Sequence, residues 1–120
     1  MKVLAFVGDK MCFMEMENTL RAKQSFVGGL LAAVAVTEEI DLICNDEFLV
    51  RGMEPRVILD KGDGFPVTIC GDCFICRHNN YGEFESIREE DMQIINKRVI
   101  HLDTGLAKII GMMLIMVDGI

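Results

Sequence analysis

The sequence predicts an α+β fold, a single compact domain built on a mostly antiparallel sheet with two or three helices. Three observations lead to this class. Apolar stretches of strand length recur between turns rich in glycine and polar residues, and two other segments show helical spacing. A length of 120 residues, of which 51% are apolar and 26% charged, suits one globular domain with a real core.

The chain begins with a predicted hairpin. Residues 2–7 are apolar enough for a buried strand, and residues 8–10 contain the glycine of a tight turn. From residue 12 to residue 17, cysteine and methionine alternate with Phe13 and two glutamates. This alternation is typical of a half-buried strand, which would complete the hairpin.

A short helix is predicted after the hairpin. Thr19 or the asparagine before it can serve as the N-cap, and Leu20, Gln24 and Val27 recur at helical spacing. Gly28 and Gly29 can adopt the positive φ that ends a helix.

The middle of the chain reads as strands separated by turns. Residues 30–36 form an uninterrupted apolar run, and residues 40–44 follow after a polar turn at 37–39. Because Pro55 lacks an N–H group, the segment 48–59 is predicted to mix a short strand with a loop.

The second half continues this pattern. Residues 67–70 and 73–76 are apolar on either side of a Gly-Asp pair, which favours one strand with a bulge, and residues 83–87 suit another strand. Ser86 and Glu89 have the spacing of a capping box, so a second helix is expected from there to about residue 96. Its inward stripe is predicted to comprise Met92, Ile95 and Val99.

The last part of the chain is unusually apolar. Residues 106–117 are apolar on nearly every side, which indicates an element that is fully buried or covered by another subunit. We therefore divide the chain into a domain at 1–96 and an apolar extension at 97–120, which packs on the core or on a partner in a homo-oligomer.

Charge and cysteine usage limit the classes of partner. A net charge of −7 argues against direct binding to nucleic acid or to an anionic membrane, since phosphate neutralisation needs a basic stripe. Five cysteines are an odd number, which favours a reducing compartment over a secreted disulfide framework. With no long apolar run and no cleavable leader pattern, a cytoplasmic protein is expected.

One cluster has the residue types of a metal site. Cys70, Cys73, Cys76 and His78 could supply four ligands to a tetrahedral zinc. Structural zinc sites usually take ligands from two separated knuckles, whereas these four lie within nine residues, and the flanking residues are strand-like. We therefore expect no metal and no cofactor, with the cysteines at buried strand positions.

No catalytic signature is visible. His78 and His101 stand outside any motif, and Glu89-Glu90-Asp91 suits a charge-favoured first turn of a helix. The segment 61–64 lacks the ending of a phosphate loop. A protein that is not an enzyme is therefore expected.

A binding site for a small anion is the better candidate. The site is expected to draw backbone amides from a glycine turn, a polar strand end and the arginines that flank a proline loop. Its predicted residues are Gly28, Gly29, Asn45, Arg51 and Arg56.

The order of several motifs resembles a family of small phage and mobile-element proteins, domain of unknown function 3846. The matching pieces are Asn18-Thr19-Leu20, Gln24, Val27-Gly28-Gly29, Cys44-Asn45, Gly52 with Pro55, Phe74-Ile75-Cys76, and Gly82-Glu83-Phe84 with Ser86 and Glu89. The resemblance covers about residues 1–96. It implies a setting in host–virus interaction and no particular reaction.

These observations together suggest a non-enzymatic phage protein that binds a ligand. The most concrete version is a counter-defence protein that sequesters a nucleotide-derived immune signal. Two alternatives stay open at this point, an inhibitor of a host protein or DNA mimic with an acidic face, and a regulator stabilised by zinc.

Overall fold

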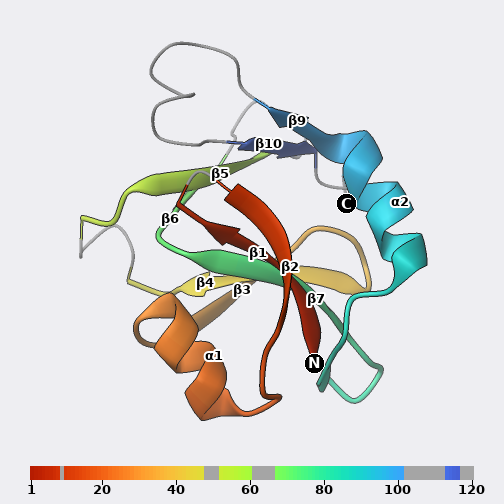
Figure 1. Cartoon of the computed structure of the whole chain (residues 1–120), viewed down its shortest axis with the longest axis horizontal. Helices are drawn as coiled ribbons and strands as arrows, with labels where there is room; N and C mark the ends of the chain where they lie inside the picture. Colours follow the sequence, from red (N-terminus) through yellow and green to blue (C-terminus); the bar gives the residue numbers. More distant parts are fainter. Residues whose placement is uncertain (9, 48–51, 61–66, 102–112, 117–120) are drawn as a thin grey trace.

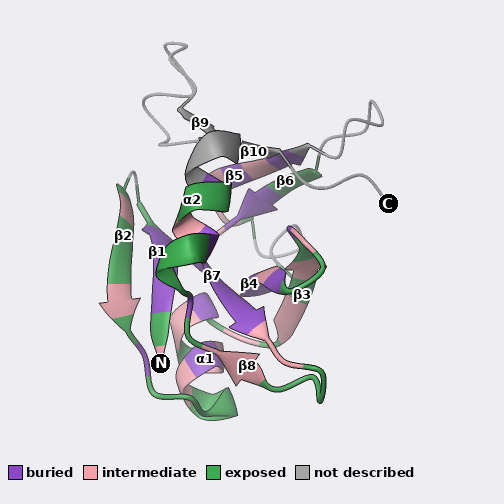
Figure 2. Ribbon diagram, turned by 90° about the vertical axis from the view of Figure 1, so that its right-hand side faces the viewer, coloured by how far each residue is buried: buried purple, intermediate pink, exposed green. Residues whose placement is uncertain are grey.

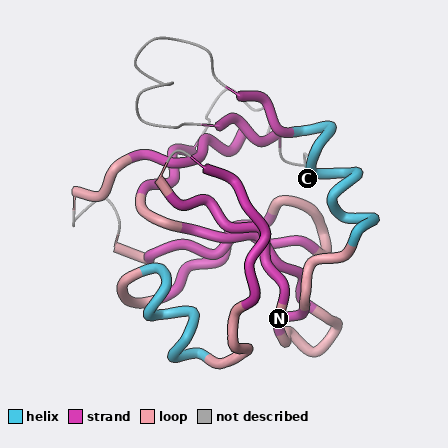
Figure 3. The backbone as a smooth tube through the Cα atoms, viewed as in Figure 1, coloured by secondary structure: helices cyan, strands magenta, loops and turns pink. Residues whose placement is uncertain are grey.

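The computed structural model describes residues 1–8, 10–47, 52–60, 67–101 and 113–116, and within them the chain forms a compact α+β domain with two helices and two sheets (Figure 1). Most of its regular structure is strand (Figure 3). The strands are β1 (Lys2–Val7), β2 (Lys10–Glu15), β3 (Leu31–Ala35), β4 (Ile40–Asn45), β5 (Pro55–Asp60), β6 (Val67–Cys70), β7 (Cys73–His78), β8 (Phe84–Glu85), β9 (Val99–His101) and β10 (Met113–Met116). The helices are α1 (Leu20–Val27) and α2 (Glu89–Arg98).

The larger sheet is antiparallel throughout. Its strands follow the order β2-β1-β7-β4-β3, and the short β8 pairs with the end of β7. The predicted hairpin at the start of the chain is confirmed, because β1 and β2 pair along their whole length, from Lys2 opposite Glu15 to Val7 opposite Lys10. The two central apolar segments also pair as predicted, as β3 and β4.

The smaller sheet has the order β6-β5-β10-β9. It contains one parallel pair, β5 with β10, whereas its other neighbours are antiparallel. Pro55 is the first residue of β5, and the ladder to β6 shifts register between Pro55 and Val57. A proline at the first position of a strand leaves the rest of the ladder intact, which explains how β5 lies between two partners.

The prediction of one bulged strand across residues 67–76 is wrong. Gly71 has a φ of +83°, and the chain turns there from β6 in the smaller sheet into β7 in the larger one. This turn carries the chain between the sheets, so that Cys70 and Cys73 belong to different sheets.

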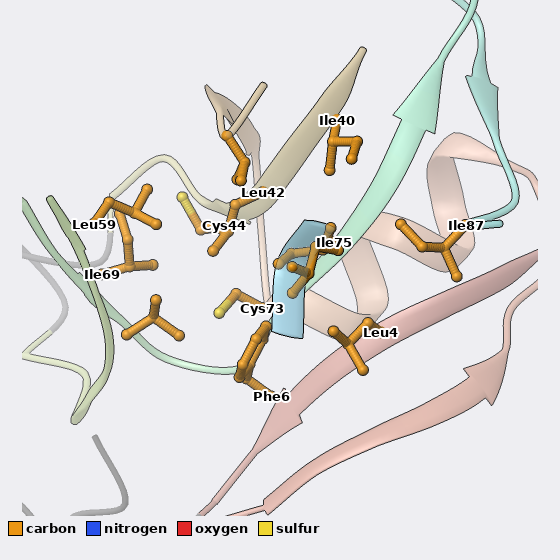
Figure 4. Close-up of a cluster of buried hydrophobic side chains, with 13 residues drawn as sticks. Leu4, Phe6, Ile40, Leu42, Cys44, Leu59, Ile69, Cys73, Ile75 and Ile87 are labelled. Atoms are coloured by element: carbon orange, nitrogen blue, oxygen red, sulfur yellow. The ribbon is translucent and has the colours of Figure 1, made fainter. Parts of the chain in front are cut away.

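Side chains fill both faces of the larger sheet. One cluster, centred on Phe6, Leu42 and Ile75, packs against the smaller sheet and Ile95 of α2 (Figure 4). A second cluster, which includes Val3 and Phe74, lies on the opposite face under α1, and the rings of Phe26 and Phe74 meet edge to face with centroids 5.6 Å apart. Burial on both faces explains why β1, β4 and β7 lack a polar alternation (Figure 2).

Helix α1 begins and ends as predicted, although the apolar residue at its start does not pack on the core. The Thr19 side chain accepts a hydrogen bond from Ala22 N, and Gly28 adopts a φ of +83° at the C-cap. Leu20, however, is 61% exposed, whereas Lys23 is buried. The Lys23 ammonium donates to Asn18 Oδ1 at 2.8 Å and to Thr19 O at 3.2 Å, and burial lowers its pKa.

Helix α2 is capped differently from the prediction. Asp91 Oδ2 accepts a hydrogen bond from Arg88 N at 2.9 Å, and this bond closes the first turn. Ser86 instead accepts from the backbone N–H of Lys2. Ile95 is fully buried and Met92 packs against the core, as predicted, whereas the side chain of Val99 lies outside the described residues. No helix in the described ranges is both long and apolar enough to cross a membrane.

Candidate functional site

The start of α2 holds a buried ion-pair cluster. Arg77, from the larger sheet, donates through Nη1 to Asp91 of α2 and through Nη2 to Glu39 of the turn after β3. Burial disfavours the charged form of Arg77, but the two carboxylates outweigh this effect, so its pKa is raised. Because Arg77 is held by two acids, the cluster ties α2 to the sheet and presents no spare positive charge to a ligand.

A pocket of about 360 Å³ lies over this cluster. Its walls include Thr37, Glu39, Arg77, Arg88 and Glu90. The charges in these walls largely offset one another, and the Thr37 hydroxyl already accepts hydrogen bonds from two backbone N–H groups in its own turn.

A second pocket, of about 320 Å³, lies on the other side of the first turn of α2. Its lining combines two cations with apolar side chains and one carboxylate: Lys2, Phe13, Ile87, Arg88, Glu89 and Met92. Phe13 is 47% exposed, and Lys2 Nζ lies 4.6 Å from the centroid of its ring. We call this the Phe13 pocket.

The cations of the Phe13 pocket are only loosely held. Arg88 is a little more than half exposed, and its guanidinium lies 3.4 Å from a Glu90 oxygen and 3.8 Å from a Glu85 oxygen. Lys2 forms no ion pair within the described part of the chain. Exposed pairs of this kind contribute at most about 1 kcal/mol, so both cations can turn toward an anion.

His78 and Asp41 form a separate pair at the end of β7. His78 Nδ1 lies 2.6 Å from Asp41 Oδ2, beside a pocket of about 400 Å³ lined by Glu38, Glu39, His78, Asn79, Asn80 and Gly82. A carboxylate can orient an imidazole as a general base, but none of these lining residues is a serine, threonine or cysteine nucleophile.

The structure brings together part of the predicted anion site. A Cβ placed on Gly28 would lie 3.9 Å from Asn45 Nδ2 and 3.8 Å from the Met53 side chain. Asn45 is buried, its Nδ2 donates to Val27 O at 3.1 Å, and its Oδ1 accepts from Glu47 N at 2.7 Å. These bonds brace the end of α1 against β4. The backbone N–H of Gly29 likewise donates to Gln24 O at 3.0 Å.

Arg56 lies on the same side of the molecule. Met53 also packs against Gly71, and the next residue, Asp72, has a carboxylate 3.5 Å from Arg56 Nε. A second carboxylate, Glu54, lies 3.4 Å from Arg56 Nη1, and the Arg56 side chain is only 14% exposed. An anion at this position would have to displace both acids. Arg51, the other predicted arginine, lies outside the described residues.

The cysteines take strand positions, as predicted. Cys73 and Cys76 lie in β7 and Cys70 ends β6, and in the described part of the chain no three His, Cys, Asp or Glu side chains gather as a metal site would require. All three are buried, and burial raises the pKa of each thiol, that of Cys76 to about 12. These thiols are therefore protonated, core-like groups at neutral pH.

Sequence reasoning missed the Phe13 pocket because its residues come from distant parts of the chain. Lys2 and Phe13 meet through the β1–β2 ladder, whereas Arg88 arrives with α2. The sequence held one signal for this pocket. Phe13 shares a face of the predicted strand with two glutamates, so this aromatic residue was expected on the exposed face.

The fold and these pockets define a small two-sheet α+β domain with a mixed cationic and aromatic pocket at the start of its second helix. Residues 1–100 match domain of unknown function 3846, and the chain belongs to this family, as the ordered motifs suggested. No curated protein and no solved structure matches the chain.

Proposed function

We propose that this protein is a non-enzymatic binding protein for a small anionic, nucleotide-like ligand, held in the Phe13 pocket. The observation that supports the proposal most is the meeting of an exposed aromatic ring with two loosely held cations around one pocket. A nucleotide combines the two matching features, a flat base and a phosphate.

The ring of Phe13 provides a platform for a base. A side chain of this size leaves apolar surface in water when it is half exposed, and a stacked base would cover that surface. Stacking of one base on an aromatic side chain contributes about 1–3 kcal/mol. Ile87 and Met92 supply the apolar floor that such a base would contact.

The phosphate would lie between Lys2 and Arg88. A chain of net charge −7 repels anions at long range, so attraction must come from local cations. Arg88 immediately precedes α2, where the helix dipole also favours negative charge. Among the described residues, Glu89 is the one carboxylate of the lining, and its exposed side chain can turn toward solvent.

Binding without chemistry fits the setting that the family resemblance implies. The only imidazole–carboxylate pair found in the described residues is His78 with Asp41, and His78 lines a different pocket. We therefore propose that the protein acts in host–virus interaction by sequestering a nucleotide-derived immune signal as a cytoplasmic counter-defence protein.

A thermal-shift screen with nucleoside mono- and diphosphates and cyclic dinucleotides tests the proposal first, because a ligand that binds only the folded state raises apparent stability. Calorimetry then compares the wild type with Arg88→Ala, Lys2→Ala and Phe13→Leu. Loss of a charged hydrogen bond should weaken binding by about 1.5–3 kcal/mol in Arg88→Ala.

Arg21→Ala is the matched control, because Arg21 is an exposed arginine of α1 outside every pocket described above. It should bind as the wild type does. Undiminished affinity in both Arg88→Ala and Lys2→Ala would contradict the proposal. If Arg56→Ala lost affinity instead, the site would be the proline loop predicted from the sequence.

A further inference from the structure

The strand β3 is an outer strand of the larger sheet. It pairs with β4 along one side, and among the described residues no strand pairs with its other side. In Figure 2, β2 and β3 lie at opposite margins of this sheet, so the β3 edge is far from the Phe13 pocket.

The outward backbone groups of β3 can be assigned from two hydrogen bonds at the ends of the strand. Asp46 N donates to Leu30 O at 2.8 Å, and Val36 N donates to Ile40 O at 2.9 Å. Residues 30 and 36 therefore direct their polar groups toward β4. Because these directions alternate along an antiparallel strand, Leu31, Ala33 and Ala35 direct their N–H and C=O groups outward.

The β3 edge lacks the features that usually prevent strand pairing. Residues 30–36 contain no charge and no proline, and Leu30 is 57% exposed. The opposite edge differs, because β2 begins with Lys10 and ends with Glu15. Outer strands are generally protected by such charges, by proline or by bulges, and an unprotected edge is a template for another strand.

We propose that a second copy of this chain pairs with the β3 edge, antiparallel and about a two-fold axis at Ala33. Leu31 of one copy then lies opposite Ala35 of the other, and Ala32 opposite Val34. This register pairs all five residues of β3. Each of the three residues with outward backbone groups lies opposite another such residue, which gives about six interchain hydrogen bonds. A register centred on Ala32 or on Val34 pairs fewer of these outward residues.

Side chains on both faces fit this arrangement. Ala32 and Val34 pack on the cluster shared with the smaller sheet, and Leu31 packs on the cluster under α1, yet all three are only partly buried. The second copy continues both clusters across the edge. Residues 30–36 carry no charge, so this register brings no carboxylates of the two acidic chains opposite each other within the strand.

The mass in solution tests the dimer. Light scattering coupled to size exclusion should give twice the chain mass for the wild type. In Ala33→Lys two ammonium groups would lie directly opposite each other, so the dissociation constant should rise about tenfold or more. Ala33 is exposed, so the substitution leaves the core unchanged. Cys12→Lys, on the exposed face of β2, is the matched control and should remain dimeric.

Amide exchange locates the interface independently. The N–H groups of Leu31, Ala33 and Ala35 should be protected in the wild type and should exchange rapidly in Ala33→Lys. A monomeric wild type, an Ala33→Lys variant as dimeric as the wild type, or rapid exchange of these amides in a dimer would each overturn the proposal.

Discussion

Buried thiols should make the free energy of unfolding of this domain depend on pH. Burial raises the pKa of Cys44 from an ordinary 9.0 to about 11 and that of Cys76 to about 12, and it raises that of Cys73 as well. The unfolded chain therefore releases these protons first as pH rises. The buried thiols therefore make their full contribution to the free energy of unfolding below about pH 9. This contribution is lost as the pH rises toward the pKa values of the thiols in the folded protein.

Urea unfolding between pH 8 and pH 10.5 should show this loss, with a slope of up to about 1.4 kcal/mol per pH unit for each thiol. The lowered pKa of Lys23 acts in the opposite direction, but one lysine does not offset three thiols. Cys76→Ala should reduce the slope and Cys12→Ala, at an exposed position, should not. A stability that is constant across this range would contradict the burial of the thiols.

The two ion pairs of the Arg77 cluster should contribute unequally to the free energy of unfolding. The Asp91 side chain is 2% exposed, whereas that of Glu39 is 64% exposed. Arg77→Met leaves the Asp91 carboxylate buried without a cationic partner, which should cost about 3–5 kcal/mol in the free energy of unfolding. Glu39→Gln should cost less than about 1 kcal/mol. Equal effects of the two substitutions in chemical denaturation would argue against this geometry.

Single residues show where the sequence was informative about a site and where it was not. Gly28 and Asn45 do come together, but hydrogen bonds to the helix end occupy Asn45, and two acids occupy Arg56. Residue type reveals that a group can bind an anion. It does not reveal whether a neighbour from another element already uses that group, which depends on the tertiary fold.

At the scale of elements, residues close in sequence predicted the helices better than the turns between strands. Helix α1 was predictable because both of its ends carry their own signals, Thr19 and Gly28. Helix α2 was placed correctly, but its cap was assigned to Ser86, because the sequence does not show that Lys2 N takes the Ser86 hydroxyl. The turn at Gly71 was read as a bulge, since the strands on either side have the same apolar character.

The N-cap of α1 offers a direct test at this scale. Thr19→Ala removes the hydrogen bond from Ala22 N to Thr19 Oγ1, which measures 3.1 Å, and should lower the free energy of unfolding by about 1 kcal/mol. Ser25→Ala, an exposed change within the same helix, should be neutral or slightly stabilising. If the two variants unfold at the same urea concentration, the cap contributes nothing.

At the scale of the whole molecule, the composition correctly predicted a single α+β domain, but the division into two sheets was not visible. That division depends on pairing between β5 and β10, which lie more than fifty residues apart. Sequence periodicity reports which face of a strand is buried. It carries no information about which distant strand lies alongside.

The position of β10 predicts the effect of truncation. Met113–Met116 lie between β5 and β9, so they form an inner strand of the smaller sheet. Deleting residues 105–120 exposes the edges of both neighbours and should cause aggregation. A truncated chain that remains soluble, with the far-ultraviolet spectrum of the intact protein, would show that the smaller sheet does not need β10.

An NMR titration with a nucleoside monophosphate locates the bound ligand on the protein. The amide signals of Lys2, Phe13 and Arg88 and the methyl signal of Met92 should shift together with one affinity, while the amide signals of Asn45, Arg56 and Asp72 stay in place. Shifts confined to Asn45 and Arg56, or no shifts with any nucleotide that the thermal screen includes, would contradict ligand binding in the Phe13 pocket.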